Sequence, residues 1–83
     1  MVFRIKYKRS VFSDLKNLDR PVAERILRDI ESGLAENPHS GEALTGQFRG
    51  LYKYRIGEWR VIYAILSDSV LILRIRHRSV AYQ

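Results

Sequence analysis

Apolar and polar positions repeat with one period in the first half of the chain and with another in the second half. Residues 2–7 alternate between apolar and basic side chains, which is typical of a half-buried strand. From Ser10, a candidate N-cap, apolar residues recur at helical spacing as far as Leu18. The first part of the chain therefore predicts a strand followed by a short helix.

A second helical pattern covers residues 22–34 and ends before the Asn-Pro pair at 37–38. Asp19 precedes it as a candidate cap, and Pro21 is tolerated in a first helical turn. Gly33 lies near the end of this helix, where a glycine lowers the stability of the helix by about 1 kcal/mol relative to Ala. We expect the last turn either to fray or to pack closely against another part of the chain.

The second half of the chain predicts strands. Residues 38–47 contain Gly, Ser and Thr and predict a loop. Three strand patterns rich in β-branched and aromatic residues follow, at Leu51 to Ile56, Trp59 to Leu66 and Val70 to Arg76. The connections between them are short, so we expect an antiparallel meander. The fold class is α+β, in the order β-α-α-β-β-β, with two helices on one face of a small, twisted, mainly antiparallel sheet and residues 1–83 in a single domain.

The composition of the chain excludes several kinds of site. It has 83 residues and no Cys, which excludes disulfides, thiol catalysis and most zinc sites. The longest apolar run, Val61 to Leu66, is far shorter than the roughly 20 residues that span a bilayer. We expect no membrane insertion or secretion, and a cytoplasmic location.

The positive charge of the chain is concentrated in its second half. Of the formal net charge of +6, residues 1–46 contribute +1 and residues 47–83 contribute +5. Such segregated charge favours a polyanionic partner, either nucleic acid or an acidic protein. The alternative is a basic surface that only keeps the protein in solution.

Alternation along the strands places most of these cations on one face of the sheet. Lys53 and Arg55 share a face of the first meander strand, and Arg60 opens the middle strand. On the last strand one side carries Arg74, Arg76 and, if the strand continues, Arg78; the other side carries Leu71, Leu73 and Ile75. Since the helices cover one face, we expect the cations on the open one, with almost no carboxylates among them.

Few residues in the chain suit catalysis other than these cations. No metal cluster, catalytic triad or phosphate-binding loop is present, and the only His residues are His39 and His77. Cations suit phosphoryl transfer, and RNA carries its own nucleophile, the 2′-OH, so an RNase needs neither a metal nor a cofactor. Tyr82, close to several cations, is either a general base or an aromatic anchor, and His77 is either structural or part of the site.

Two segments identify a resemblance to a known family. The run from Leu51 to Tyr63 (LYKYRIGEWRVIY) and the terminal run from His77 to Tyr82 (HRSVAY) resemble the RelE branch of the RelE/ParE toxins of prokaryotic toxin-antitoxin systems. The resemblance covers the whole chain. It implies a ribosome-dependent endoribonuclease, an mRNA interferase that cuts translated mRNA in the A site of the 30S subunit and is neutralised by a cognate, RelB-like antitoxin.

The resemblance also implies roles for individual residues. Lys53 and Arg55 would contact the RNA backbone and assist proton transfer, and Arg60 would stabilise the scissile phosphate. Arg78 would act on the phosphate or the leaving group, and Tyr82 would orient or deprotonate the 2′-OH. Further RNA contacts are expected from Arg74, Arg76 and His77. The alternative is a ParE-like toxin, which has the same fold but inhibits DNA gyrase by binding.

Overall fold

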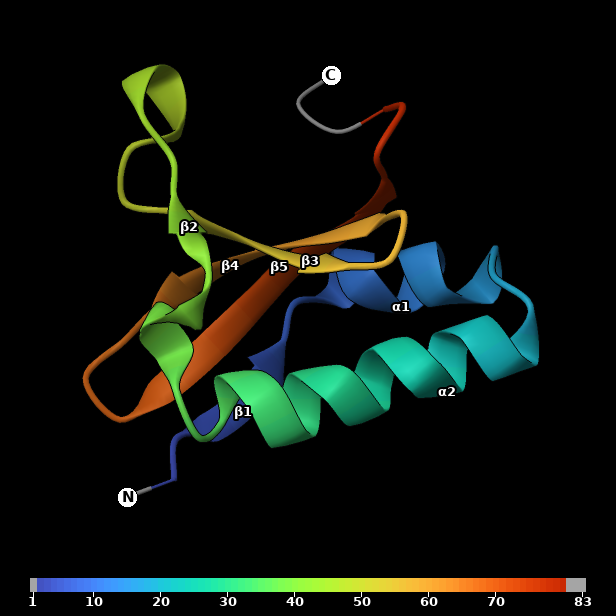
Figure 1. Cartoon of the computed structure of the whole chain (residues 1–83), viewed down its shortest axis with the longest axis horizontal. Helices are drawn as coiled ribbons and strands as arrows, with labels where there is room; N and C mark the ends of the chain where they lie inside the picture. The colour runs from blue at the N-terminus through green and yellow to red at the C-terminus, as the bar shows by residue number, and fades with distance from the viewer. Residues whose placement is uncertain (1, 81–83) are drawn as a thin grey trace.

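Two helices and a five-stranded mixed sheet make up the protein in a computed structural model that describes residues 2–80 (Figure 1). The elements in chain order are β1 (Arg4–Tyr7), α1 (Arg9–Lys16), α2 (Arg20–Asp29), a π-helical turn η1 (Ile30–Leu34), a 3-10 turn η2 (Pro38–Ser40), β2 (Glu42–Ala43), a 3-10 turn η3 (Gly46–Phe48), β3 (Tyr52–Ile56), β4 (Trp59–Ile65) and β5 (Ser69–His77). The predicted α+β class and the meander are confirmed, with one short strand added.

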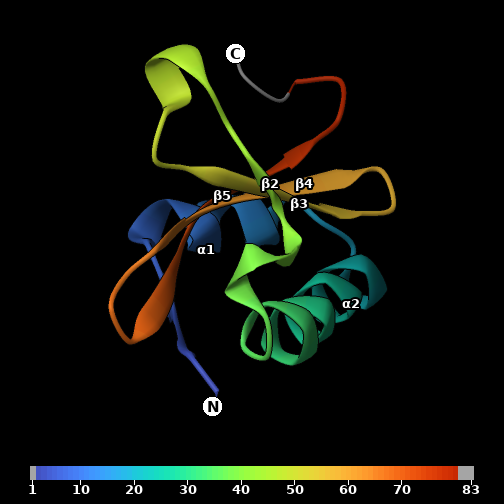
Figure 2. The same cartoon turned by 60° about the vertical axis from the view of Figure 1, so that its left-hand side comes forward.

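The strands lie in the order β1-β5-β4-β3-β2. β1 runs parallel to β5, and every other neighbouring pair is antiparallel. Both α1 and α2 cover the same face of the sheet, whereas the segment between β2 and β3 rises on the other side (Figures 1 and 2). We call this other side, away from the two helices, the open face.

The core lies between the helices and the sheet. Fully buried side chains come from α1, α2 and η1 and from the helix side of β4 and β5: Val11, Ile26, Ile30, Leu34, Val61, Tyr63, Val70 and Ile72. Burial of one such aliphatic side chain contributes about 1.5–3 kcal/mol, so this layer fixes the helices on one face and leaves the other face available. None of the helices within residues 2–80 has the length and apolar character needed to cross a membrane.

The second predicted helix is divided into α2 and the π-helical turn η1. Gly33 lies in η1 against the side chain of Tyr54, and a Cβ at residue 33 would be 2.5 Å from the Tyr54 hydroxyl oxygen. A glycine therefore lets this turn approach β3. Of the two expectations for this turn, close packing is confirmed.

Tyr63 joins the chain after η1 to the sheet. Its buried hydroxyl donates a hydrogen bond to the Pro38 carbonyl oxygen (2.7 Å) and accepts one from the Gly41 N–H (3.2 Å). Its ring stacks on that of Tyr52, with 5.6 Å between the ring centroids. Burial raises the pKa of Tyr63 to about 12.

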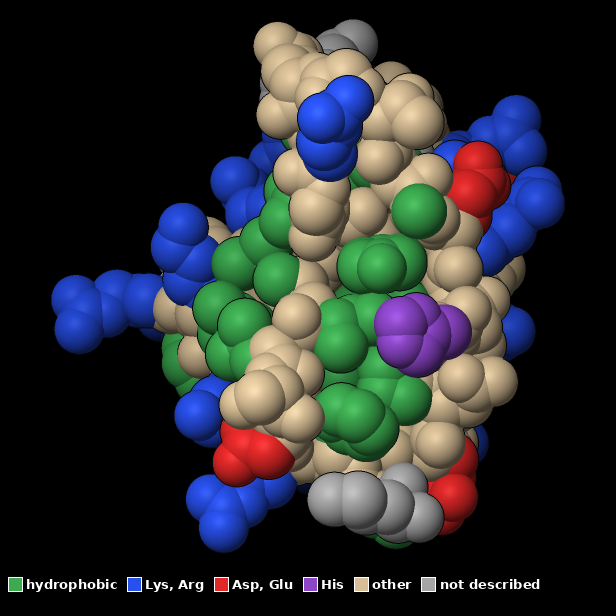
Figure 3. Space-filling view, turned by 90° about the vertical axis from the view of Figure 1, so that its left-hand side faces the viewer, with side chains coloured by type: hydrophobic (Ala, Val, Ile, Leu, Met, Phe, Trp, Pro, Cys, Tyr) green, Lys and Arg blue, Asp and Glu red, His purple; other side chains and the backbone are tan. Residues whose placement is uncertain are grey.

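The predicted loop over residues 38–47 is wrong at Glu42–Ala43, which form the edge strand β2. Glu42 pairs with Lys53 and Ala43 with Tyr52 of β3. These two residues have no strand pattern of their own, and their extended conformation depends on pairing with a strand about ten residues further along the chain. Figure 3 shows this end of the molecule, where apolar side chains gather beside a histidine and most Lys and Arg side chains lie along the margins.

A β-bulge changes which side chains of β5 face the core. Ile62 pairs with Arg74, but the next residue of β4, Tyr63, pairs with Ile72, so Leu73 is an extra residue in β5. The prediction that Leu71 and Leu73 share the side of Ile75 is therefore wrong. Ile72 fills the core, and Leu71 and Leu73 are half-buried on the open face.

The predicted helix caps are also different in the structure. Lys8, not Ser10, is the N-cap residue of α1, and the Ser10 hydroxyl donates a hydrogen bond to the Leu73 carbonyl oxygen (2.7 Å). Asp19 does occupy the N-cap position of α2, but its side chain makes no capping hydrogen bond. The Ser10 hydroxyl, which the sequence predicted as a helix cap, therefore binds the backbone of β5 instead.

Candidate functional site

Three arginines lie side by side across the open face of the sheet. Arg60 of β4 is the register partner of both Arg55 of β3 and Arg76 of β5. Neighbouring strands are about 4.8 Å apart, and directly opposed residues point to the same face. We call these three residues the arginine row. Like charges opposed in this way destabilise a sheet, so a bound anion would offset an electrostatic cost.

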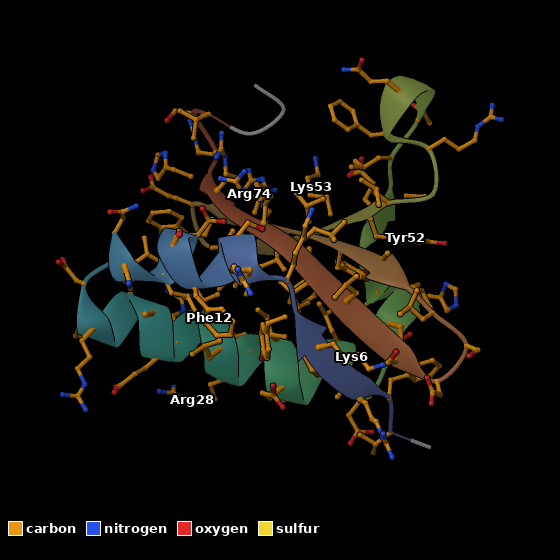
Figure 4. All side chains as sticks on the ribbon, turned by 180° about the vertical axis from the view of Figure 1, so that it is seen from behind. Lys6, Phe12, Arg28, Tyr52, Lys53 and Arg74 are labelled. Atoms are coloured by element: carbon orange, nitrogen blue, oxygen red, sulfur yellow. The ribbon has the colours of Figure 1, made fainter. Side chains whose placement is uncertain are left out.

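A second row lies next to the arginine row and has an apolar centre. Ile62 of β4 is paired with Lys53 on one side and with Arg74 on the other. Figure 4 shows Lys53 and Arg74 on the side of the sheet away from the helices, whereas Arg28 lies on α2. The prediction that several strands place their cations on the open face is confirmed for these residues.

Arg60 is held at the end of the β3–β4 hairpin. Its guanidinium donates hydrogen bonds to the carbonyl oxygens of Gly57 (3.3 Å) and Trp59 (3.2 Å). Gly57 has φ +59°, a conformation that glycine adopts without strain and that a two-residue hairpin turn requires. A polar hollow of about 310 Å³ opens beside Arg60, and its lining residues are Ser40, Gly41, Glu42, Lys53, Tyr54, Arg55 and Arg60.

Carboxylates from the first half of the chain reach the cations, so the expectation of almost none among them is wrong. The Glu42 carboxylate lies 3.8 Å from the Lys53 ammonium nitrogen. The Asp14 carboxylate accepts two hydrogen bonds from the Arg74 guanidinium, each 3.0 Å long, and these raise the pKa of Arg74 above its usual value. Both contacts join different elements of the fold, so alternation along one strand does not reveal them.

The structure separates His77 from the arginine row. His77 is paired with Trp59 on the helix side of the sheet, with 5.2 Å between the two ring centroids. Its Nε2 lies 3.5 Å from a carboxylate oxygen of Glu58. Arg78 follows the end of β5, is exposed, and donates its backbone N–H to the Glu58 carbonyl oxygen (2.8 Å), which places it next to the hairpin turn that holds Arg60. Tyr82 lies outside the described residues.

Reasoning from the sequence missed an apolar groove in the open face. The groove has a volume of about 240 Å³ and is lined by Leu44, Phe48, Leu51, Ile62 and Leu73 together with Lys8, Arg74 and Arg76. The apolar residues between β2 and β3 could have indicated this groove. The bulge that adds Leu73 to it could not be inferred from the alternation of side chains along β5. Over residues 2–80 no group of three or more His, Asp or Glu side chains is arranged to hold a metal ion.

Comparison with known proteins identifies the family. Residues 5–82 match the ParE toxin of type II toxin-antitoxin systems (parDE). The chain is 34% identical over 73 residues to Toxin RelE of Mycobacterium tuberculosis, a match that covers 84% of this chain and 75% of that protein.

Solved structures of toxin-antitoxin complexes share the fold. The RelBE2 complex from Mycobacterium tuberculosis contains a chain with a TM-score of 0.90 and 23% identity, and the match covers 95% of this chain and 94% of that one. The archaeal RelE-RelB complex from Pyrococcus horikoshii gives a TM-score of 0.71 and 29% identity over 98% of this chain and 100% of that one. The matched family, the curated relative and the shared fold agree: the chain is a toxin of a type II toxin-antitoxin system and belongs to the RelE/ParE toxin family.

Proposed function

We propose that this toxin is an endoribonuclease that cuts translated mRNA in the ribosomal A site. The observation that carries the proposal is the arginine row, in which Arg55, Arg60 and Arg76 of three adjacent strands share one face. In the free protein, three like charges at strand spacing repel one another and destabilise the sheet. A bound RNA phosphate would form charge-assisted hydrogen bonds with these guanidinium groups and relieve the repulsion, and both effects would favour binding.

The reaction uses the nucleophile that RNA supplies. The 2′-oxygen forms a bond with the adjacent phosphorus, the bond from phosphorus to the 5′-oxygen breaks, and the products are a 2′,3′-cyclic phosphate and a free 5′-hydroxyl. A base removes the proton from the 2′-OH, and an acid gives a proton to the departing 5′-oxygen. Guanidinium groups stabilise the extra negative charge on phosphorus in the transition state.

The hollow beside the hairpin is the proposed place of this chemistry. Arg60 is fixed there by the carbonyl oxygens of its own turn, and Lys53 and Arg55 line the same hollow. Arg60 would hold the scissile phosphate, while Lys53 and Arg55 would contact the RNA backbone. Arg stays protonated, so Arg55 would act by its charge and Lys53 is the better candidate to exchange a proton. Arg78, next to the turn, would assist the phosphate or the leaving group.

Two partners complete the proposal. The RelE chain from Pyrococcus horikoshii was solved in a complex with RelB, which supports a cognate antitoxin for this chain as well. A net charge of +5 in residues 47–83 suits an acidic partner that covers the cations. The second partner is the translating ribosome with its mRNA, and a toxin acting there would work in the cytoplasm.

The experiment measures cleavage of mRNA on purified ribosomes stalled with an empty A site, with primer extension to map the cut. The unmodified protein should cut within the A-site codon, and Arg60→Ala should lower the rate at least about 100-fold, as loss of one transition-state donor does. The matched control is Arg28→Ala, since Arg28 is exposed on α2. Tyr82→Phe should lower cleavage at least about tenfold if Tyr82 is the base. Equal rates for Arg60→Ala and Arg28→Ala would exclude the proposed site.

The second candidate function is ParE-like inhibition of DNA gyrase, and the match to the ParE toxin family favours it. The same purified protein tested in a gyrase supercoiling assay separates the two. Inhibition of supercoiling together with uncut mRNA on ribosomes would replace the ribonuclease proposal by the gyrase one.

A further inference from the structure

The bulge in β5 puts a leucine on a face that is otherwise rich in cations. Because Leu73 is the extra residue between Ile72 and Arg74, its side chain lies on the open face together with that of Arg74. The core does not need it, since Ile72 and Ile75 are buried on the helix side. Bulges commonly redirect a side chain next to a functional site, so the position of Leu73 requires an explanation on the open face.

Leu73 forms part of the apolar groove, whose other wall comes from the segment between β2 and β3. Leu44 precedes η3, Phe48 ends it and Leu51 precedes β3, so the segment that rises over the sheet contributes three apolar side chains. Ile62 contributes from β4. The volume of about 240 Å³ is below the roughly 300–1,000 Å³ of pockets that enclose whole small ligands, so the groove suits one flat part of a larger molecule.

Cations surround this groove and connect it with the arginine row. Lys8, Arg74 and Arg76 line it, and no Asp or Glu is among its described lining residues. Arg76 also belongs to the arginine row as the partner of Arg60, so the groove and the proposed phosphate site are continuous. An apolar floor with cations on the rim is the combination that binds a base together with its phosphate.

We propose that the groove binds one base of single-stranded RNA, next to the nucleotide whose phosphate lies on the arginine row. The inference rests on the proposed function in that it takes RNA as the substrate class. It adds a base subsite, with Leu73 as a residue that determines how tightly the neighbouring nucleotide is held. Arg74 is fixed by Asp14 at the rim and would meet the phosphate of that nucleotide.

The test follows methyl resonances of the full-length protein by NMR during titration with adenosine 5′-monophosphate and, separately, with ribose 5-phosphate. The nucleotide should shift the methyl signals of Leu73, Ile62 and Leu51 along one saturable curve, whereas ribose 5-phosphate, which has no base, should leave them in place. Equal shifts with both compounds would overturn the proposal.

Two leucine variants sharpen the test. Leu73→Ser should weaken nucleotide binding at least about fivefold, since the variant removes apolar surface against which the base would be buried. The matched control is Leu66→Ser, because Leu66 is exposed in the connection between β4 and β5 and does not line the groove. Thermal unfolding of both variants checks that each one is folded. The same loss in both variants would contradict the proposed site.

A third titration uses a synthetic acidic, leucine-rich peptide. Shifts of the groove methyls with this peptide and none with the nucleotide would make the groove a protein-docking surface and overturn the proposal. The outcome of these titrations does not depend on the outcome of the cleavage assay. Nucleotide binding in the groove with uncut mRNA would refute only the ribonuclease, and cut mRNA without nucleotide shifts would refute only the base subsite.

Discussion

The carboxylate of Asp14 binds Arg74 through two hydrogen bonds of 3.0 Å and also accepts the backbone N–H of Ile75 at 2.9 Å. Pairing between β1 and β5 ends at Tyr7 and Ile72, so the rest of this edge of β5 has no strand partner within residues 2–80. Side chains of α1 form hydrogen bonds with the backbone of this edge instead. One carboxylate thus accepts a backbone hydrogen bond from the strand edge and also orients a cation of the open face.

We predict that Asp14→Ala destabilises the fold by about 2–3 kcal/mol. The carboxylate is nearly buried, with 10% of the side chain exposed, and hydrogen bonds to charged groups contribute about 1.5–3 kcal/mol. Asp14→Asn should lower the free energy of unfolding by less, since the amide oxygen of Asn still accepts one hydrogen bond. Urea unfolding measures both variants.

The control for this prediction is the exposed pair Arg20–Glu24 on α2, with 3.2 Å between nitrogen and oxygen. Glu24→Ala should change the free energy of unfolding by no more than about 0.5 kcal/mol, because solvent screens such pairs. If Asp14→Ala costs as little as Glu24→Ala, the carboxylate does not join α1 to β5 in solution.

The contrast between Lys53 and Leu73 shows how far the sequence predicts this site. Lys53 and Arg55 lie on the face that alternation assigned to them, because the two-residue period is a local property of extended backbone. Leu73 does not, because a bulge arises from the register between two strands and from the packing of Ile72 and Ile75. Local patterns therefore predicted the two helices, the strands other than β2, and the face of the sheet on which most of the cations lie.

Contacts between distant segments were beyond such reasoning. The hydrogen bonds of Asp14 with Arg74 and the ion pair of Glu42 with Lys53 depend on how α1 and β2 dock against the sheet. The same holds for the apolar groove, whose walls come from β4, β5 and the segment between β2 and β3. The position of each of these segments is set by the whole fold, and the charge of the site follows from it.

Tyr63→Phe should destabilise the protein by about 1–3 kcal/mol near neutral pH. The variant leaves the Pro38 carbonyl and the Gly41 N–H without their partner in a buried place. Burial raises the pKa of Tyr63 to about 12, against about 10 in the unfolded chain. The stabilisation by the phenol is thus complete below pH 10 and is lost as the pH rises from 10 towards 12.

The measurement for Tyr63 compares unfolding free energies of the unmodified protein and the variant from pH 7 to pH 11. The difference should stay constant up to about pH 9.5 and then shrink. A difference that does not depend on pH would mean that the hydroxyl is not buried in the folded protein.

Gly33→Ala should be coupled to Tyr54. A Cβ at residue 33 would lie 2.5 Å from the Tyr54 hydroxyl oxygen, so the ring must move. Removing that oxygen in Tyr54→Phe leaves more room, and Ala is favoured over Gly in a helix by about 1 kcal/mol. A double-mutant cycle on unfolding free energies should give a coupling of about 1 kcal/mol, with Gly33→Ala less harmful in the Tyr54→Phe background. Additive effects would show that the two residues do not touch.

Removing the charge of Glu42 should strengthen RNA binding. The carboxylate of Glu42 lies 3.8 Å from the Lys53 ammonium and lines the same hollow as Arg55 and Arg60, where it repels a phosphate. Its side chain is exposed, so Glu42→Gln should cost no more than about 0.5 kcal/mol of stability. We expect the dissociation constant for a single-stranded RNA with 2′-O-methyl riboses, which is not cut, to fall about fivefold.

Salt dependence separates this effect from a general change in charge. If Lys53 gains a phosphate contact in Glu42→Gln, the slope of log affinity against log salt should become steeper by up to about 0.7, the value for one phosphate on a single strand. Glu24→Gln on α2 makes the same change in net charge away from the open face and should leave the slope unchanged. Fluorescence anisotropy at several KCl concentrations measures both. Equal slopes for the two variants would place the RNA away from the hollow and would move the proposed phosphate site off the arginine row.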